Sequence, residues 1–171
     1  MAKALAVIDV QNDYFENGSF PLWNMGDVVS NIEKVIWKAN EKRVPVILVQ
    51  HIVENKGIAS FLTAGTPGAN IHQRILCAAQ RAPVIVKHYA DSFFQTNFEK
   101  TLDDLKVTEL ILCGMMTQNC VTHTAISKSA EKYKVTVLTD CCTTVDERIH
   151  KIALKALSTR VEMALSTDEI F

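Results

Sequence analysis

Six short apolar runs, each followed by a stretch with helical or loop character, constrain the fold of this chain most strongly. The runs are rich in Val, Ile and Leu and cover residues 4–9, 44–50, 83–87, 109–113, 135–139 and 161–165. Nearly continuous apolar runs are typical of strands that are buried on both faces of a parallel sheet. The alternation therefore predicts an α/β sandwich with a mostly parallel sheet and right-handed crossovers.

Helical patterns lie between several of these runs. Apolar residues recur at three- and four-residue spacing in 27–43 and again in 146–158, and we expect a further helix over 121–132. Thr96, Asn97 or Thr101 could cap a helix that runs to Lys106. Segment 51–82 contains three glycines and a proline, and we expect it to be a functional loop that covers the active site.

The size and charge of the chain limit its class and its partners. Its 171 residues fit one domain over 1–171, and a net charge of -1 without a basic stripe argues against nucleic acid and anionic membranes as partners. The first ten residues lack a signal-peptide pattern. The five cysteines are odd in number and match no disulfide framework. We therefore expect a cytoplasmic protein in a reducing compartment.

Three polar residues follow or end separate apolar runs. Asp9 ends the first run, Lys87 ends the third, and Cys120 lies between the fourth run and the next helical pattern. Ligands of open parallel sheets bind outside the carboxyl ends of the strands. These three side chains are therefore candidates for one site, although each alone is more commonly a turn, surface or packing residue.

The three groups also make chemical sense together. A helix N-terminus and a nearby ammonium both favour the thiolate of a cysteine, so we expect Lys87 and the helix after Cys120 to lower the pKa of this thiol. A carboxylate such as Asp9 can take the thiol proton and pass it to a leaving amine. The other cysteines have no such partners in the sequence, and we interpret Cys141 and Cys142 as structural.

Four segments resemble motifs of the isochorismatase-like hydrolases. They are residues 8–13 (IDVQND), 61–69 (FLTAGTPGA), 86–94 (VKHYADSFF) and 114–121 (GMMTQNCV). They occur in the order found in that superfamily, and the resemblance covers essentially the whole chain. It implies a doubly wound, Rossmann-like, six-stranded parallel sheet with helices on both faces.

The resemblance also implies a catalytic triad of Asp9, Lys87 and Cys120 in a cysteine amidohydrolase. It implies a cis peptide between Met115 and Met116, with the backbone N–H groups of Met116 and Cys120 forming an oxyanion hole. The implied reaction is hydrolysis of a small-molecule amide through a thioester on Cys120. Members of this superfamily commonly form dimers or larger homo-oligomers, and we expect the same here.

The sequence departs from the metal-binding members of the superfamily. Nicotinamidases carry an Asp-x-His pair after the second strand, whereas this chain offers only His51 and Glu54 there. We therefore expect no metal and no cofactor. Whether His51 contributes to a metal or a substrate site is open from the sequence.

Candidate substrate-binding residues flank the three motifs. They are Gln11, Phe15, Phe61, His88, Tyr89, Phe93, Thr117 and Gln118. Two alternatives to amide hydrolysis stay open: an isochorismatase-type vinyl-ether hydrolase that uses Asp9 as acid, and a non-catalytic binding protein with the same fold. The physiological substrate cannot be assigned from fold resemblance.

Overall fold

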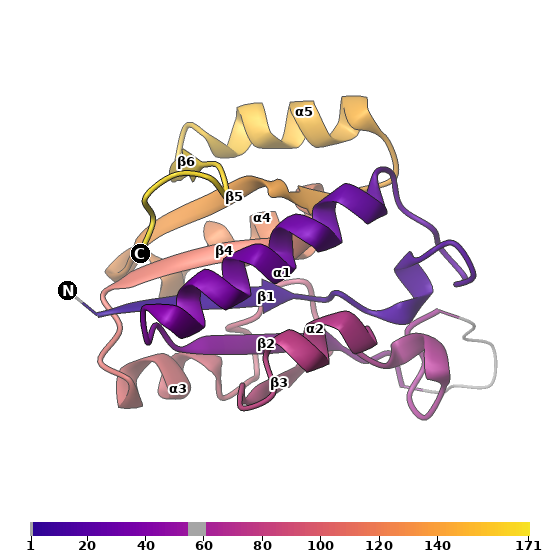
Figure 1. Ribbon diagram of the computed structural model, residues 1–171, viewed down its shortest axis with the longest axis horizontal. Helices are drawn as coiled ribbons and strands as arrows, with labels where there is room; N and C mark the ends of the chain where they lie inside the picture. Colours follow the sequence, from indigo (N-terminus) through magenta and orange to yellow (C-terminus); the bar gives the residue numbers. More distant parts are fainter. Residues whose placement is uncertain (1, 55–60) are drawn as a thin grey trace.

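The protein is built around one six-stranded parallel sheet. A computed structural model describes residues 2–54 and 61–171 (Figure 1). The strands are β1 (Lys3–Ile8), β2 (Val46–His51), β3 (Val84–Lys87), β4 (Glu109–Met115), β5 (Lys134–Thr143) and β6 (Glu162–Ala164). Each of the six apolar runs therefore forms a strand, and the parallel sheet predicted from them is confirmed.

The strand order is β3-β2-β1-β4-β5-β6, so the sheet is doubly wound. The chain moves outward from β1 to β3, returns to the centre at β4, and then moves to the other edge. In Figure 1 the carboxyl ends of the central strands lie on the side away from the two chain termini. The order reverses between β1 and β4, which is where ligands bind in open sheets of this kind.

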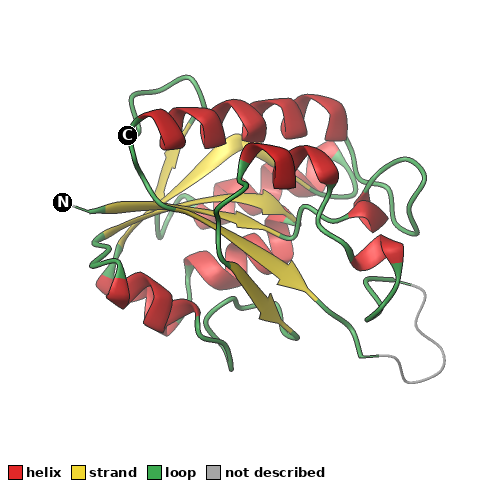
Figure 2. Ribbon diagram, turned by 60° about the horizontal axis from the view of Figure 1, so that its bottom comes forward, coloured by secondary structure: helices red, strands yellow, loops and turns green. Residues whose placement is uncertain are grey.

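Helices cover both faces of the sheet (Figure 2). The α-helices are α1 (Met25–Glu41), α2 (Gln73–Ala78), α3 (Phe98–Asp104), α4 (Thr122–Ala125) and α5 (Glu147–Leu157). Short 3-10 turns, η1 (Asn12–Tyr14), η2 (Pro67–Ala69) and η4 (Lys128–Lys132), and a π-helical turn, η3 (Thr117–Val121), complete the described elements. The helix predicted over 27–43 corresponds to α1, and the one over 146–158 to α5.

The core explains why the apolar runs fold as strands. Five of the six residues of β1 are buried, and the buried positions of α1 form a stripe that packs on the sheet. Residues of this stripe recur every three or four positions, which places them on one helix face. A central parallel strand has no solvent face, so its sequence needs no polar alternation.

Two local predictions differ from the structure. The single helix expected over 121–132 is instead divided into η3, α4 and η4, and it begins at Thr117. Segment 51–82 contains the helix α2, which its weak apolar pattern did not indicate. Residues 55–60 of that segment lie outside the described residues, so its predicted cover over the site stays a prediction. Over 2–54 and 61–171, no helix has the length and apolarity to cross a membrane.

Candidate active site

Asp9 follows β1 directly, at the point where the strand order reverses. Its N–H donates to the Val49 carbonyl of β2 at 2.9 Å, and its φ of 53° lies in the left-handed region. Aspartate tolerates this conformation better than most residues do. The carboxylate is fully buried, so a charge here requires a partner.

That partner is Lys87, the last residue of β3. Side chains on β3 alternate between exposed and buried, and Lys87 is on the buried side with no exposed area. Its Nζ lies 2.8 Å from Asp9 Oδ2 and 3.2 Å from Cys120 Sγ. The structure therefore brings together the three residues that the sequence selected from separate strands.

Lys87 has two more partners that the sequence did not indicate. Its Nζ lies 2.8 Å from Nδ1 of His51, the last residue of β2, and it donates to the Tyr89 carbonyl at 3.1 Å. The His51 contact follows from the register, because His51 and Lys87 are paired across the two strands. The sequence signal that could have revealed this contact is a histidine at the end of β2, the strand between β1, which Asp9 follows, and β3, which Lys87 ends.

Cys120 lies in a tight segment after β4. Gly114 has a φ of +120°, and a Cβ on it would lie 2.0 Å from the Ile8 carbonyl oxygen, so only glycine lets β4 approach β1 this closely. The Met115–Met116 peptide is cis, and Met116 caps the π-helical turn η3 that contains Cys120. Cys120 therefore sits in the first turn of a helical segment rather than before it.

The electrostatics of Cys120 correct one expectation from the sequence. Burial is the largest influence and the Asp9 charge adds to it, and together they raise the pKa of Cys120 to about 12. Lys87 lowers this pKa but does not outweigh them. The pKa of the thiol is thus raised and not lowered as we expected, because the sequence showed the ammonium but not the depth of burial.

The Asp9 carboxylate is poised to accept a proton. The contact with Lys87 is an ion pair by distance, and neither oxygen has a hydrogen-bond partner of good geometry among the described residues. Burial lowers the pKa of Lys87, but the neighbouring Asp9 carboxylate opposes it and the net shift is upward, so the ammonium stays charged. A charged pair beside a neutral thiol is an arrangement suited to general-base activation.

Two of the predicted substrate-binding residues make buried contacts within the protein. Gln11 is fully buried and donates both amide hydrogens to backbone carbonyls, those of His51 and Ala69. Phe93 is buried and its ring packs against Phe98 and Tyr133. Their role in substrate binding stays a prediction, since sequence proximity to a motif does not specify which way a side chain points.

The other predicted aromatic and imidazole side chains form surface or rim contacts. Phe15 stacks on His72 with ring centroids 3.8 Å apart, and Phe61 packs against Tyr14 and Phe20. Tyr89 is half-exposed and pairs with Phe94, and His88 contacts the Ile52 carbonyl through Nδ1 at 2.8 Å. Among the described residues, none of these side chains forms a hydrogen bond with Cys120 Sγ, which is contacted by Lys87.

Thr117 and Gln118 begin the π-helical turn. The Thr117 hydroxyl is buried and lies 2.9 Å from Nδ1 of His150, so it anchors the turn to α5. Gln118 Nε2 points to the Met116 sulfur at 3.8 Å, while its Oε1 is buried without a partner in the described part of the chain. A buried acceptor without a partner is unfavourable unless a ligand satisfies it.

Tyr14 is a second residue that the sequence did not single out. It is almost fully buried in η1, and burial, followed by the charge of Asp9, raises its pKa well above the usual range. Its phenol is therefore part of the electrostatic surroundings of the site. Its position five residues after Asp9, directly after the first motif, was the available signal.

The site offers atoms of the kinds that bind metals, but their surroundings do not fit a metal ion. One ligand atom each of Asp9, His51 and Cys120 lies within 4.8 Å of the other two. The Lys87 ammonium lies within 3.2 Å of all three residues and so takes the position of a cation. Glu54, the other candidate from the sequence, is exposed and lies 3.9 Å from His88.

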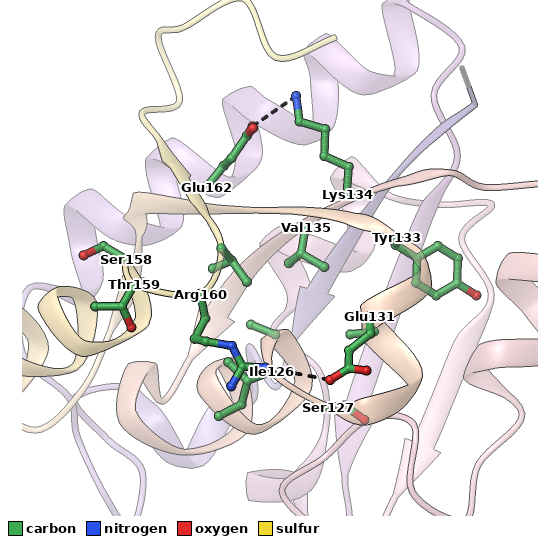
Figure 3. A pocket seen from close by; sticks show the side chains of 13 residues that line it. Ile126, Ser127, Glu131, Tyr133, Lys134, Val135, Ser158, Thr159, Arg160 and Glu162 are labelled. Carbon is green, nitrogen blue, oxygen red and sulfur yellow. Dashed lines mark ion pairs between the residues drawn. The ribbon is translucent and has the colours of Figure 1, made fainter.

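A separate pocket of about 460 Å³ lies at the other end of the sheet. Figure 3 shows two ion pairs at it, Lys134 with Glu162 and Arg160 with Glu131. Lys134 and Glu162 are the first residues of β5 and β6, so this pocket borders the amino ends of the strands. It is therefore distinct from the site at Cys120.

Comparison with known proteins places the chain in a family. The sequence model of the Isochorismatase domain matches residues 3–169. The chain belongs to the isochorismatase family. An uncharacterized isochorismatase family protein of Bacillus subtilis is 38% identical over 87% of this chain and 82% of its own length. An isochorismatase family protein from Desulfovibrio vulgaris has a similar structure, with a TM-score of 0.88, 26% identity, and coverage of 97% of this chain and 95% of that one.

Relatives within the isochorismatase family differ in activity. A probable inactive nicotinamidase of Arabidopsis thaliana is 30% identical over 86% of this chain and 83% of its own length. An N-carbamoylsarcosine amidase of Arthrobacter sp is 26% identical over 77% of this chain and 55% of its own length. Membership therefore establishes an isochorismatase-like hydrolase family, while the reaction must be argued from the site.

Proposed function

We propose that the protein hydrolyses the C–N bond of a small-molecule amide through a thioester on Cys120. The observation that carries this proposal is the buried cluster in which the Lys87 ammonium lies 2.8 Å from Asp9 and 3.2 Å from Cys120. A carboxylate, an ammonium and a thiol in one buried site provide a base, a fixed positive charge and a nucleophile. The amidase among the relatives supports this class of reaction.

In the first half-reaction Asp9 takes the proton of Cys120 as Sγ attacks the amide carbonyl carbon. The N–H groups of Met116 and Cys120 are proposed to hold the resulting oxyanion. Asp9 then passes its proton to the nitrogen, the C–N bond breaks, and ammonia or an amine leaves. The raised pKa of Cys120 supports proton transfer during attack over a resting thiolate.

In the second half-reaction water attacks the thioester. Asp9 takes a proton from the water, the C–S bond breaks, and the Sγ of Cys120 receives that proton as the acid product leaves. Lys87 stays charged throughout and stabilises the Asp9 carboxylate in the resting enzyme. We propose Gln118 as a substrate contact because its buried Oε1 can accept a hydrogen bond from the substrate.

A panel of small primary amides tests this function, with ammonia release and acid formation as readouts. We expect turnover of at least one amide, and a mass increase on the peptide that contains Cys120 when the reaction is quenched early. Cys120→Ala should abolish both signals. Turnover of a vinyl ether that survives Cys120→Ala would instead support the ether hydrolase, and an unreactive wild-type protein would support the non-catalytic alternative.

Assembly stays a prediction from the family resemblance. We expect a homodimer or larger homo-oligomer, and sedimentation velocity at micromolar concentration measures it directly. A monomer over the whole concentration range would contradict the expectation without affecting the proposed chemistry.

A further inference from the structure

His51 lies at the place where the Lys87 side chain must pass to reach Asp9. Strand β2 separates β1 from β3 in the sheet, and His51 is the last residue of β2. It is paired in register with Lys87, and its Nδ1 lies 2.8 Å from Lys87 Nζ. The lysine therefore reaches across the end of a strand, and the imidazole is the side chain it meets there.

The contact fixes the chemical state of the imidazole. A lysine ammonium donates hydrogen bonds and accepts none, so Nδ1 of His51 must present its lone pair and the ring hydrogen must be on Nε2. The neutral ring is consistent with its surroundings, because burial and then the Lys87 charge lower the pKa of His51, and Asp9 opposes them only in part. A charged ring would place two cations 2.8 Å apart.

The contact between His51 and Lys87 matters because the ammonium has fewer hydrogens than neighbours. Lys87 has three hydrogens and four neighbours within 3.2 Å, namely Asp9, His51, the Tyr89 carbonyl and Cys120. His51 and the Tyr89 carbonyl are neutral acceptors, so they fix the ammonium without cancelling its charge. A carboxylate in place of His51 would hold Lys87 equally well but would neutralise its effect on the thiol.

We infer that His51 is a positioning residue that holds the Lys87 ammonium between Asp9 and Cys120 as a neutral hydrogen-bond acceptor. The inference deepens the proposed function and rests on it for the effect on turnover. The effect on the Cys120 thiol is independent of any substrate, because Lys87 acts on the thiol in the resting protein.

Two substitutions of His51 distinguish the role of its hydrogen-bond acceptor from that of its titrating ring. His51→Leu removes the acceptor, whereas His51→Asn places an amide oxygen near the position of Nδ1 and removes the titrating ring. The rate of Cys120 alkylation by iodoacetamide at pH 9, followed by peptide mass spectrometry, reports on Lys87, since the ammonium lowers the pKa of the thiol. We expect His51→Leu to slow alkylation about five- to tenfold, which corresponds to a pKa rise of up to about one unit.

The matched control is His88→Leu. His88 neighbours Lys87 in sequence, but its ring contacts the Ile52 carbonyl. We expect this variant and His51→Asn to alter Cys120 alkylation by less than about twofold. Equal slowing in His51→Leu and His51→Asn, or no slowing in either, would overturn the inference. A circular dichroism melt of each variant verifies that the comparison is made between folded proteins.

Turnover adds a second readout if an amide substrate is found. His51→Leu should lower kcat at least tenfold with little change in KM, and His51→Asn should recover most of that loss. The groups that face the ring are Lys87 at the end of β3, His88 after it, Asp9 after β1 and Cys120 in η3. Protonation of His51 below its lowered pKa would displace Lys87, so the acid limb of kcat/KM should move to lower pH in His51→Asn.

An unchanged acid limb in His51→Asn would overturn the part of the inference that concerns the neutral ring. If the wild-type protein hydrolyses no amide, the proposed function fails while the alkylation experiment still decides the role of His51. The two failures are therefore distinguishable.

Discussion

Two regions of the molecule bury cysteine thiols, and the difference between them supports Cys120 as the proposed nucleophile. Cys113, Cys141 and Cys142 lie in β4 and β5, and burial raises the pKa of each above its usual value. Cys120 is buried to a similar degree, and its pKa is raised as well. Low pKa is thus not what distinguishes the candidate nucleophile.

The distinction is in the charged neighbours. The main carboxylate near the β5 thiols is that of Asp140, which accepts hydrogen bonds from the Ser166 N–H and the Asn31 amide. It raises the pKa values of Cys141 and Cys142 further. Cys120 has both an ammonium at 3.2 Å and the Asp9 carboxylate, whose oxygens have no hydrogen-bond partner of good geometry among the described residues. A buried thiol becomes a useful nucleophile when a base can take its proton and a fixed cation can stabilise the charge that remains.

The largest expected effect comes from exchanging the nucleophile itself. Cys120→Ser should lower kcat on an amide substrate by on the order of 10⁴-fold or more, because a serine hydroxyl is a far poorer nucleophile with this base. Cys141→Ala, the matched change in the other region, should leave kcat within about threefold and cost only about 1–2 kcal/mol of stability. Comparable losses of turnover in both variants would remove the distinction between the two regions.

Removing the Lys87 ammonium should strongly destabilise the region around Cys120. Lys87→Met leaves the buried Asp9 carboxylate without its ion-pair partner, so we expect a loss of about 3–5 kcal/mol in the free energy of unfolding. Urea denaturation measures this loss. The double variant Asp9→Asn with Lys87→Met should regain most of the stability but none of the activity, whereas an equally unstable double variant would contradict the ion-pair account.

The next largest effect is expected in the pH dependence of alkylation, which should differ between Cys120 and the exposed Cys77. A pKa raised to about 12 keeps Cys120 protonated at neutral pH, and only the thiolate is alkylated. We expect the exposed Cys77 to react more than about a hundredfold faster at pH 7.5, and Cys120 alkylation to rise about tenfold per unit between pH 8 and 11. A plateau below pH 9 for Cys120 would show a preformed thiolate instead.

The smallest expected effect concerns the support of the site. Ser92, in the segment after Lys87, donates its N–H to the Thr124 hydroxyl of α4 at 3.0 Å, and the two hydroxyls are 2.8 Å apart. Both residues are fully buried. Thr124→Val should cost about 1–3 kcal/mol of stability, because it leaves buried Ser92 groups without a partner. Thermal denaturation measures this cost, and Thr124→Ser is the control that keeps the hydroxyl.

Much of the fold could be predicted because its strands are buried on both faces. Continuous apolar runs marked all six strands, and Asp9 and Lys87 stood out because a charged residue at the end of such a run is conspicuous. The short helix α2 was missed because it is only six residues long and carries few buried residues. The register shift between β4 and β5 likewise has no counterpart in the apolar pattern.

The site was less predictable than the strands because side-chain direction is set by packing. Gln11 and Phe93 adjoin the motifs but point into backbone contacts and the core. His51 gave an ambiguous signal, because its role depends on which residue faces it across β2 and β3. The pKa of Cys120 could not be predicted either, since it depends on burial and on the balance between Asp9 and Lys87.

The most direct test of the central claim is a paired measurement on Asp9→Asn. The Asp9 charge raises the pKa of Cys120, so its removal should make the thiol more acidic and speed its alkylation at pH 8. The same change removes the proton acceptor and should lower amide turnover by about 10²- to 10⁴-fold. Faster alkylation together with lost turnover would establish Asp9 as the base for a protonated Cys120. Retained turnover, or alkylation that slows along with turnover, would contradict the account.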